Sequence, residues 1–124
     1  MKPGDTFLVD LGCGEHLHVV LSHPSGEDRS VVVTMISTYD ADYKNSTCIL
    51  RPEDGHPFIK SLSCLAYHLS MLLPEMKLES LAIKRKPAFS NEVLQRILKG
   101  ADADNSDLPN KFWVILDDQG LIPR

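Results

Sequence analysis

The stretch His16-Leu17-His18-Val19-Val20-Leu21-Ser22 decides how this chain begins to fold. Apolar residues recur at every second position, and successive side chains of a β-strand point to opposite faces. The stretch therefore predicts a strand with Leu17, Val19 and Leu21 on one face and both histidines on the other. Two neighbouring imidazoles near neutral pH can transfer protons, bind a metal ion or simply face solvent.

The composition predicts one ordinary globular domain over residues 1–124. Apolar residues make up 43% of the chain and charged residues 24%, which is typical of globular proteins. No apolar run approaches the roughly 20 residues of a membrane-spanning helix, so we expect no membrane association. The first residues lead directly into a strand and do not resemble a secretory leader. We therefore expect a cytoplasmic protein whose three cysteines, Cys13, Cys48 and Cys64, are reduced thiols.

Charge is distributed unevenly along the chain. The net charge of −4 argues against adhesion to DNA or to anionic membranes through bulk electrostatics. Residues 61–99, however, carry 6 basic and 3 acidic side chains. Lys84-Arg85-Lys86 is the densest positive point, and it fits either a phosphate contact or a solvated turn.

The order of predicted elements is several strands followed by two helices. Period-two patterns and β-branched runs predict strands between about residues 6 and 73, the strongest at 29–38. Helices are predicted at about 90–99 and 107–118, with Ser90 as the N-cap and Gly100 at the stop position of the first. Residues 74–88 fit either a helix or a strand. The fold class is thus mainly β with C-terminal helices (α+β), a small curled barrel.

Several short patterns resemble the MazF/PemK-type toxins of toxin–antitoxin systems. Lys2-Pro3-Gly4-Asp5 precedes the first strand, the strand ending Val19-Val20-Leu21-Ser22 leads through a loop to residues 31–38, and the hydroxyl pair Ser37-Thr38 closes that strand. Residues 61–67 are similar to the family's serine-containing strand, and residues 90–99 to its terminal helix. The resemblance covers about residues 2–100.

This resemblance implies an SH3-like barrel that forms a homodimer and cleaves single-stranded RNA without a metal or other cofactor. It also implies an antitoxin protein whose disordered tail occupies the RNA groove. The family pairs an arginine, just before the second strand's apolar core, with a threonine at the end of the third strand. The arginine position falls on His16 here and the threonine position on Ser37, with Thr38 next to it. No arginine lies between Lys2 and Arg29, and His56-Pro57-Phe58-Ile59 suggests a divergent branch.

RNA cleavage by its own 2′-hydroxyl gives each candidate residue a task. Imidazoles with pKa values near 6.5 can serve as base and acid, so His16 or His18 is the predicted base and His56 the predicted acid. Ser37 or Thr38 would donate to the phosphate. The predicted RNA-binding side chains either replace the arginine charge or stack on a base: Tyr39, Tyr43, Lys44, Lys84, Arg85 and Lys86.

Three alternatives stay open at this stage. Each of these residues can have a purely structural role, on a solvated strand face, at a strand end or in a turn. A non-catalytic barrel module that binds a protein or peptide partner is the second. A tetrahedral zinc site formed by Cys13, His16 and His18 with His56 or Cys48 is the third.

Overall fold

In the part of the chain that the structure describes, six antiparallel strands form one sheet in the order β4-β5-β3-β2-β1-β6. The computed structural model describes residues 1–12, 14–39 and 47–124. The strand bounds are β1 Thr6–Asp10, β2 Glu15–Val20, β3 Ser30–Thr38, β4 Ile49–Leu50, β5 Ser63–Pro74 and β6 Lys84–Lys86. The helices are α1 Glu75–Ser80, α2 Asn91–Asp102 and α3 Asn110–Asp118, and Pro52–Asp54 forms a 3-10 turn. The predicted class, mainly β with C-terminal helices, is confirmed.

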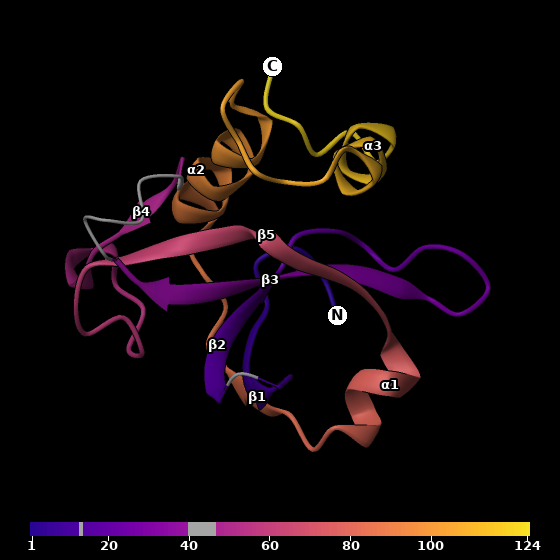
Figure 1. The fold of residues 1–124 in the computed structure, drawn as a ribbon, viewed down its shortest axis with the longest axis horizontal. Coiled ribbons are helices and arrows are strands. Elements are labelled where there is room, and N and C mark those ends of the chain that lie inside the picture. Colours follow the sequence, from indigo (N-terminus) through magenta and orange to yellow (C-terminus); the bar gives the residue numbers. More distant parts are fainter. Residues whose placement is uncertain (13, 40–46) are drawn as a thin grey trace.

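Each face of the curled sheet buries its own apolar cluster. Leu17, Val19 and Leu21 belong to the cluster that includes side chains of α2 and α3, which lie together over one face (Figure 1). Phe7 and Val9 belong to the other cluster, on the concave side near α1. Phe7 pairs with His18 and Val9 with His16, and cross-strand partners share a face. The alternation predicted for the second strand is therefore confirmed.

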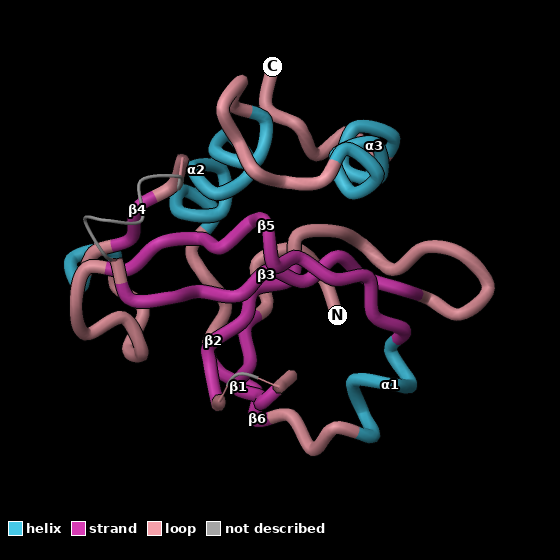
Figure 2. Tube along the Cα trace, in the orientation of Figure 1, coloured by secondary structure: helices cyan, strands magenta, loops and turns pink. Residues whose placement is uncertain are grey.

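The region that fitted either helix or strand contains one of each. Residues 75–80 form α1, and Lys84–Lys86 then pairs with β1 as the edge strand β6. The basic triplet is thus neither a turn nor a uniform patch, since its side chains alternate between the two faces of the sheet. Figure 2 shows β6 beside β1 at the end of the curl. Charged side chains on an edge strand also discourage pairing with other chains.

Strand β5 contains an irregularity in its pairing with β3. Val33 pairs with Met71 and Met35 with Ala66, so four residues of β5 face one residue of β3. The hydroxyls of Thr34 and Ser70 are 2.7 Å apart across this bulge. Within the bulge Tyr67 is fully buried, and its hydroxyl donates to the carbonyl of Ile97 in α2 at 2.7 Å. The bulge therefore ties the sheet to the helical layer.

Two predicted helix boundaries are wrong. The first helix continues past Gly100 to Asp102, with the Ser90 side chain accepting from the Val93 amide as predicted. Gly100 lies inside α2 because the helix passes very close to the sheet there, not because the helix stops. The last helix begins at Asn110 and not near residue 107, with Pro109 as the residue that precedes it. None of the helices that the structure describes is long and apolar enough to cross a bilayer.

The close approach at Gly100 gives a direct test of the packing. A Cβ at this position would lie 2.7 Å from the Tyr67 hydroxyl and 2.9 Å from the Cys48 Cβ. Gly100→Ala should therefore destabilise the fold by about 1–3 kcal/mol, although alanine is the better helix former. Denaturant unfolding measures this, with Lys99→Ala on the exposed side of the same helix as the control. An equal or higher stability of Gly100→Ala would contradict the described packing.

Candidate functional site

A groove opens where β2 begins and β3 ends, beside the loop that leads into β5. Its volume is about 200 Å³, and its lining includes His16, Ser37 and Thr38. The structure thus brings together three of the five predicted catalytic residues, contributed by two different strands. We call this space the His16 groove.

Strand register places these residues beside one another. His18 pairs with Met35, and the same antiparallel register continued by two residues sets His16 next to Ser37. On the other side of β3, Thr38 pairs with Ser63, which also lines the groove. The turn before His16 is ordered by the Asp10 carboxylate, which accepts from the amides of Gly12 at 2.8 Å and Gly14 at 3.2 Å.

Charged and aromatic side chains also surround the groove, some of them without a role predicted from the sequence. Phe58, Lys60 and Glu15 are part of its lining. The Lys86 ammonium lies 4.5 Å from the centre of the Phe58 ring, and the Lys84 ammonium lies 3.4 Å from a Glu15 carboxylate oxygen. Phe58 directly follows His56-Pro57 in the chain, and this position was the signal that could have identified it.

His18 lies in the core and not in the groove. It is 4% exposed, and its ring stacks on Phe7 with centroids 5.7 Å apart. Its Nδ1 donates to the His16 carbonyl at 2.9 Å. Burial lowers the pKa of His18, and the bond to the His16 carbonyl offsets this only in part. His18 therefore fixes the backbone of His16 while staying shielded from solvent.

His56 is likewise buried and outside the groove lining. Its Nδ1 accepts from the Phe58 amide at 3.1 Å. Its Nε2 lies 2.8 Å from the Pro87 carbonyl, which can only accept, so Nε2 carries the proton. The Thr6 hydroxyl lies 3.0 Å from the same nitrogen and donates to the Pro87 carbonyl. Burial lowers the pKa of His56, so this neutral ring positions Phe58 at the groove.

The predicted RNA-binding residues divide into three groups. Lys84 and Lys86 lie near the groove through Glu15 and Phe58, whereas Arg85 lines a separate cavity beside α1. Tyr39 follows β3, and its amide donates to the Leu62 carbonyl at 2.9 Å, next to the groove loop. Tyr43 and Lys44 lie outside the described residues.

Metal and thiol chemistry receive no support from the described part of the chain. There, no three His, Cys, Asp or Glu side chains gather as a metal site would require; Cys13 lies outside it. Cys48 and Cys64 are both buried. Burial raises the pKa of the Cys48 thiol to about 11, so it stays protonated and is a poor nucleophile at neutral pH.

Comparisons with known proteins do not assign the chain to a family. No protein-family model matches the sequence, and neither does any curated protein. The function has to be argued from the groove itself.

Because His18 and His56 are buried, we expect the stability of the fold to depend on pH. Their folded pKa values lie below the ordinary value of 6.5, so the unfolded chain binds more protons between the folded and unfolded values. The contribution of these two neutral rings to the free energy of unfolding should therefore be complete above about pH 6.5. It should decrease as the pH falls below that value. Chemical denaturation at a series of pH values measures this.

Substitution identifies the groups responsible. His56→Gln should remove part of the pH dependence, whereas His23→Gln, at an exposed loop position, should leave it unchanged. A free energy of unfolding that stays constant between about pH 7.5 and pH 5 would contradict the neutral, buried state of both rings.

Proposed function

We propose that this protein is a metal-independent endoribonuclease of the MazF/PemK toxin type, which cleaves single-stranded RNA in the His16 groove. The observation that carries the proposal is that four residues with suitable chemistry, an imidazole, two hydroxyls and an ammonium group, line one open groove: His16, Ser37, Thr38 and Lys60. The resemblance in strand order and in the Ser37-Thr38 pair supports the same activity. An SH3-like barrel of that family, in the cytoplasm and controlled by an antitoxin protein, is part of this proposal.

The reaction assigns a role to each groove residue. His16 removes the proton of the 2′-hydroxyl, whose oxygen then attacks the adjacent phosphorus. The Lys60 ammonium and the hydroxyls of Ser37 and Thr38 stabilise the negative charge of the phosphorane. The bond from phosphorus to the 5′ oxygen breaks, and that oxygen takes a proton from water. The products are a 2′,3′-cyclic phosphate and a 5′-hydroxyl, so the step needs no metal ion or oxidant.

Substrate binding would use the side chains at the edge of the groove. Proteins hold single strands by stacking bases on aromatic rings and by placing cations near the backbone phosphates. Phe58 supplies a ring, and Lys60 and Lys86 supply charge, whereas the charge of Lys84 is balanced by its ion pair with Glu15. This local excess of positive charge explains how a chain of net charge −4 can attract a polyanion at one place.

One observation favours a second candidate function, a non-catalytic module that binds a protein or peptide. Only one of the three predicted catalytic imidazoles lines the groove, since His18 and His56 are both buried in structural contacts. Apolar side chains also contribute to the groove, among them Leu8, Leu17 and Ile36, and they could receive apolar side chains of a partner. Cleavage activity separates the two functions.

The proposal predicts metal-independent cleavage that depends on His16. Purified protein with a chelator should cut an unstructured oligoribonucleotide, leaving cyclic phosphate ends detectable by mass spectrometry. His16→Ala should slow cleavage at least about tenfold through loss of the base. Lys60→Gln should slow it by about a hundredfold through loss of charge stabilisation. His23→Ala and Lys77→Gln, both exposed, are the matched controls. Intact RNA after incubation with folded wild-type protein would reject the enzymatic function.

A homodimer is also part of the proposal, and an exposed apolar surface supports it. Leu69, Met71 and Leu72 of β5 are 40–45% exposed, and Met76 of α1 is 80% exposed. Exposed apolar side chains can mark a contact with another protein, and a twofold dimer would bury the ones at its interface against a second copy of the chain.

Solution mass tests the dimer. Light scattering should give about twice the 13.8 kDa of one chain, and Leu72→Asp with Met76→Asp should give the single-chain mass through burial of unpaired charge. The matched control is Val114→Asp, which places a charge at the 41% exposed Val114 of α3. A wild-type protein of single-chain mass at high concentration would contradict the dimer.

A further inference from the structure

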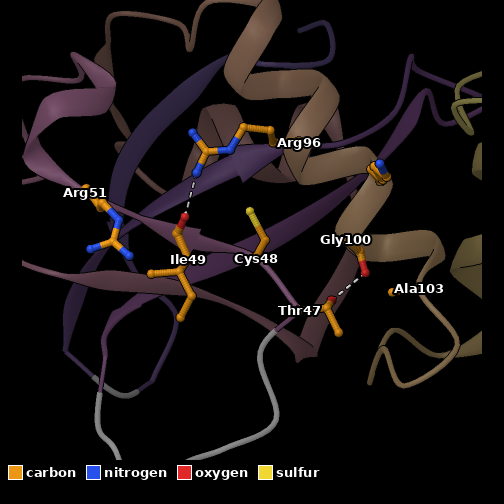
Figure 3. A pocket seen from close by; sticks show the side chains of 8 residues that line it. Thr47, Cys48, Ile49, Arg51, Arg96, Gly100 and Ala103 are labelled. Atoms are coloured by element: carbon orange, nitrogen blue, oxygen red, sulfur yellow. Dashed lines mark hydrogen bonds between the residues drawn. The ribbon is translucent and has the colours of Figure 1, made fainter.

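A second basic cavity lies between β4 and α2, apart from the His16 groove. Its volume is about 460 Å³. Ile49 and Arg51 line it from the β4 side, and Arg96, Lys99 and Gly100 line it from α2. Figure 3 shows Arg51 and Arg96 at one end and the hydrogen bond between Thr47 and Gly100 at the other. We call this space the Arg51 cleft.

The cleft carries uncompensated positive charge. Among the lining residues that the structure describes, three are basic and none is acidic. Asp54, just outside, pairs with Arg96 at 2.7 Å. Arg51 and Lys99 form no ion pair with any residue in the described ranges. About two positive charges are therefore left for a ligand, and two cations on facing elements suit a phosphate group.

Arg96 is held in a fixed orientation at the cleft. Its Nη1 donates to the Asp54 carboxylate at 2.7 Å, and its Nη2 donates to the Ile49 carbonyl at 2.8 Å. A guanidinium group has five N–H donors, so these two bonds leave three for other acceptors. A side chain that is already ordered loses little conformational entropy when it binds an anion.

The thiol that lines the cleft does not oppose an anion. The Cys48 thiol is buried, and burial raises its pKa to about 11. It therefore carries no negative charge at neutral pH. The cleft is suited to capturing an anion and has no evident nucleophile of its own.

Strand pairing connects the cleft to the His16 groove. Ser63 lines the groove and pairs with Thr38 on one side and with Leu50 on the other. Arg51 directly follows Leu50. Since neighbouring strands lie about 4.8 Å apart, the cleft lies within a few residues and one strand spacing of the groove. Single-strand-binding folds commonly hold about 4–16 nucleotides, enough to reach both places.

We propose that Arg51, Lys99 and Arg96 form a second anion site, which binds a backbone phosphate of the RNA strand whose cleavage centre is the His16 groove. The inference rests on the function proposed above and extends it. The cleft sets the path of the RNA across the β4–β5 edge of the sheet. It binds phosphate and reads no base, so it contributes affinity and not sequence preference.

A binding measurement on an uncleavable ligand tests this inference independently of catalysis. A single-stranded 2′-O-methyl oligoribonucleotide has no 2′-hydroxyl to attack, so its dissociation constant can be measured with fully active protein. Arg51→Gln with Lys99→Gln should weaken binding about tenfold and reduce the slope of log affinity against log salt by about 0.7, the value for one lost phosphate contact on a single strand. Both residues are exposed, so the fold should be retained, as unfolding midpoints would verify.

The control pair, Lys77→Gln with Lys111→Gln, removes the same charge from exposed positions on α1 and α3 and should change the affinity less than about twofold. Wild-type affinity and salt slope in the cleft variant would overturn the inference, even if wild-type protein cleaves RNA. If the wild-type protein cleaves no RNA but the cleft variant binds the oligonucleotide more weakly than wild type, the result would support the anion site and reject only the catalytic proposal.

Two competition experiments identify which kind of anion the cleft binds. In the first, inorganic pyrophosphate is tested as a ligand of the cleft. If pyrophosphate binds there while the Arg51→Gln, Lys99→Gln variant still binds the oligonucleotide normally, the cleft is a site for a small phosphate compound and the RNA path is overturned. Selective binding of polyglutamate over the oligonucleotide would assign it to an acidic protein partner and overturn the inference equally.

Discussion

The strict two-residue alternation of β2, buried on both faces, is the constraint on which the rest of the structure depends. Leu17 and Val19 lie in the cluster under the C-terminal helices, and His18 stacks on Phe7 in the opposite cluster. A shift of the register by one residue would exchange these faces. It would move an imidazole under the helices and an apolar side chain into its place. The position of His16 at the open end of the strand follows from this register.

The same constraint separates histidines that look equivalent in the sequence. His16 and His18 are two residues apart and share a face, yet only His16 lines the groove. The ring of His18 is buried and stacks on Phe7 of β1. His56 is buried, and its ring is hydrogen-bonded to the Phe58 amide and the Pro87 carbonyl. Both buried rings act on the groove indirectly, His18 through the His16 backbone and His56 through the turn that carries Phe58.

Much of the fold could be predicted from local patterns. The strand faces, the long β5, the Ser90 cap and the order of strands before helices all follow from periodicity and capping chemistry. The role of Gly100 could not, because a glycine near a helix end reads as a stop signal until the distances to Tyr67 and Cys48 are known. Residues 84–86 were ambiguous for a similar reason, since pairing with β1 decides their structure.

The candidate site was predictable in part. The pairing of His16 with Ser37 and Thr38 followed from strand order and from the family resemblance. The burial of His18 and His56 depended on neighbours remote in the chain, such as Phe7 and Pro87. Lys60 and Arg51 have unremarkable sequence surroundings, and only the folded structure reveals that one lines the groove and the other the cleft.

The most direct test of the central claim is an NMR titration of the histidine rings with an uncleavable 2′-O-methyl oligoribonucleotide. If RNA occupies the groove, the imidazole resonances of His16 should shift with the ligand, together with the amides of Phe58 and Lys60. The rings of His18 and His56 should move much less, because both are shielded from solvent. An oligonucleotide that binds while the His16 resonances stay unchanged would contradict the account.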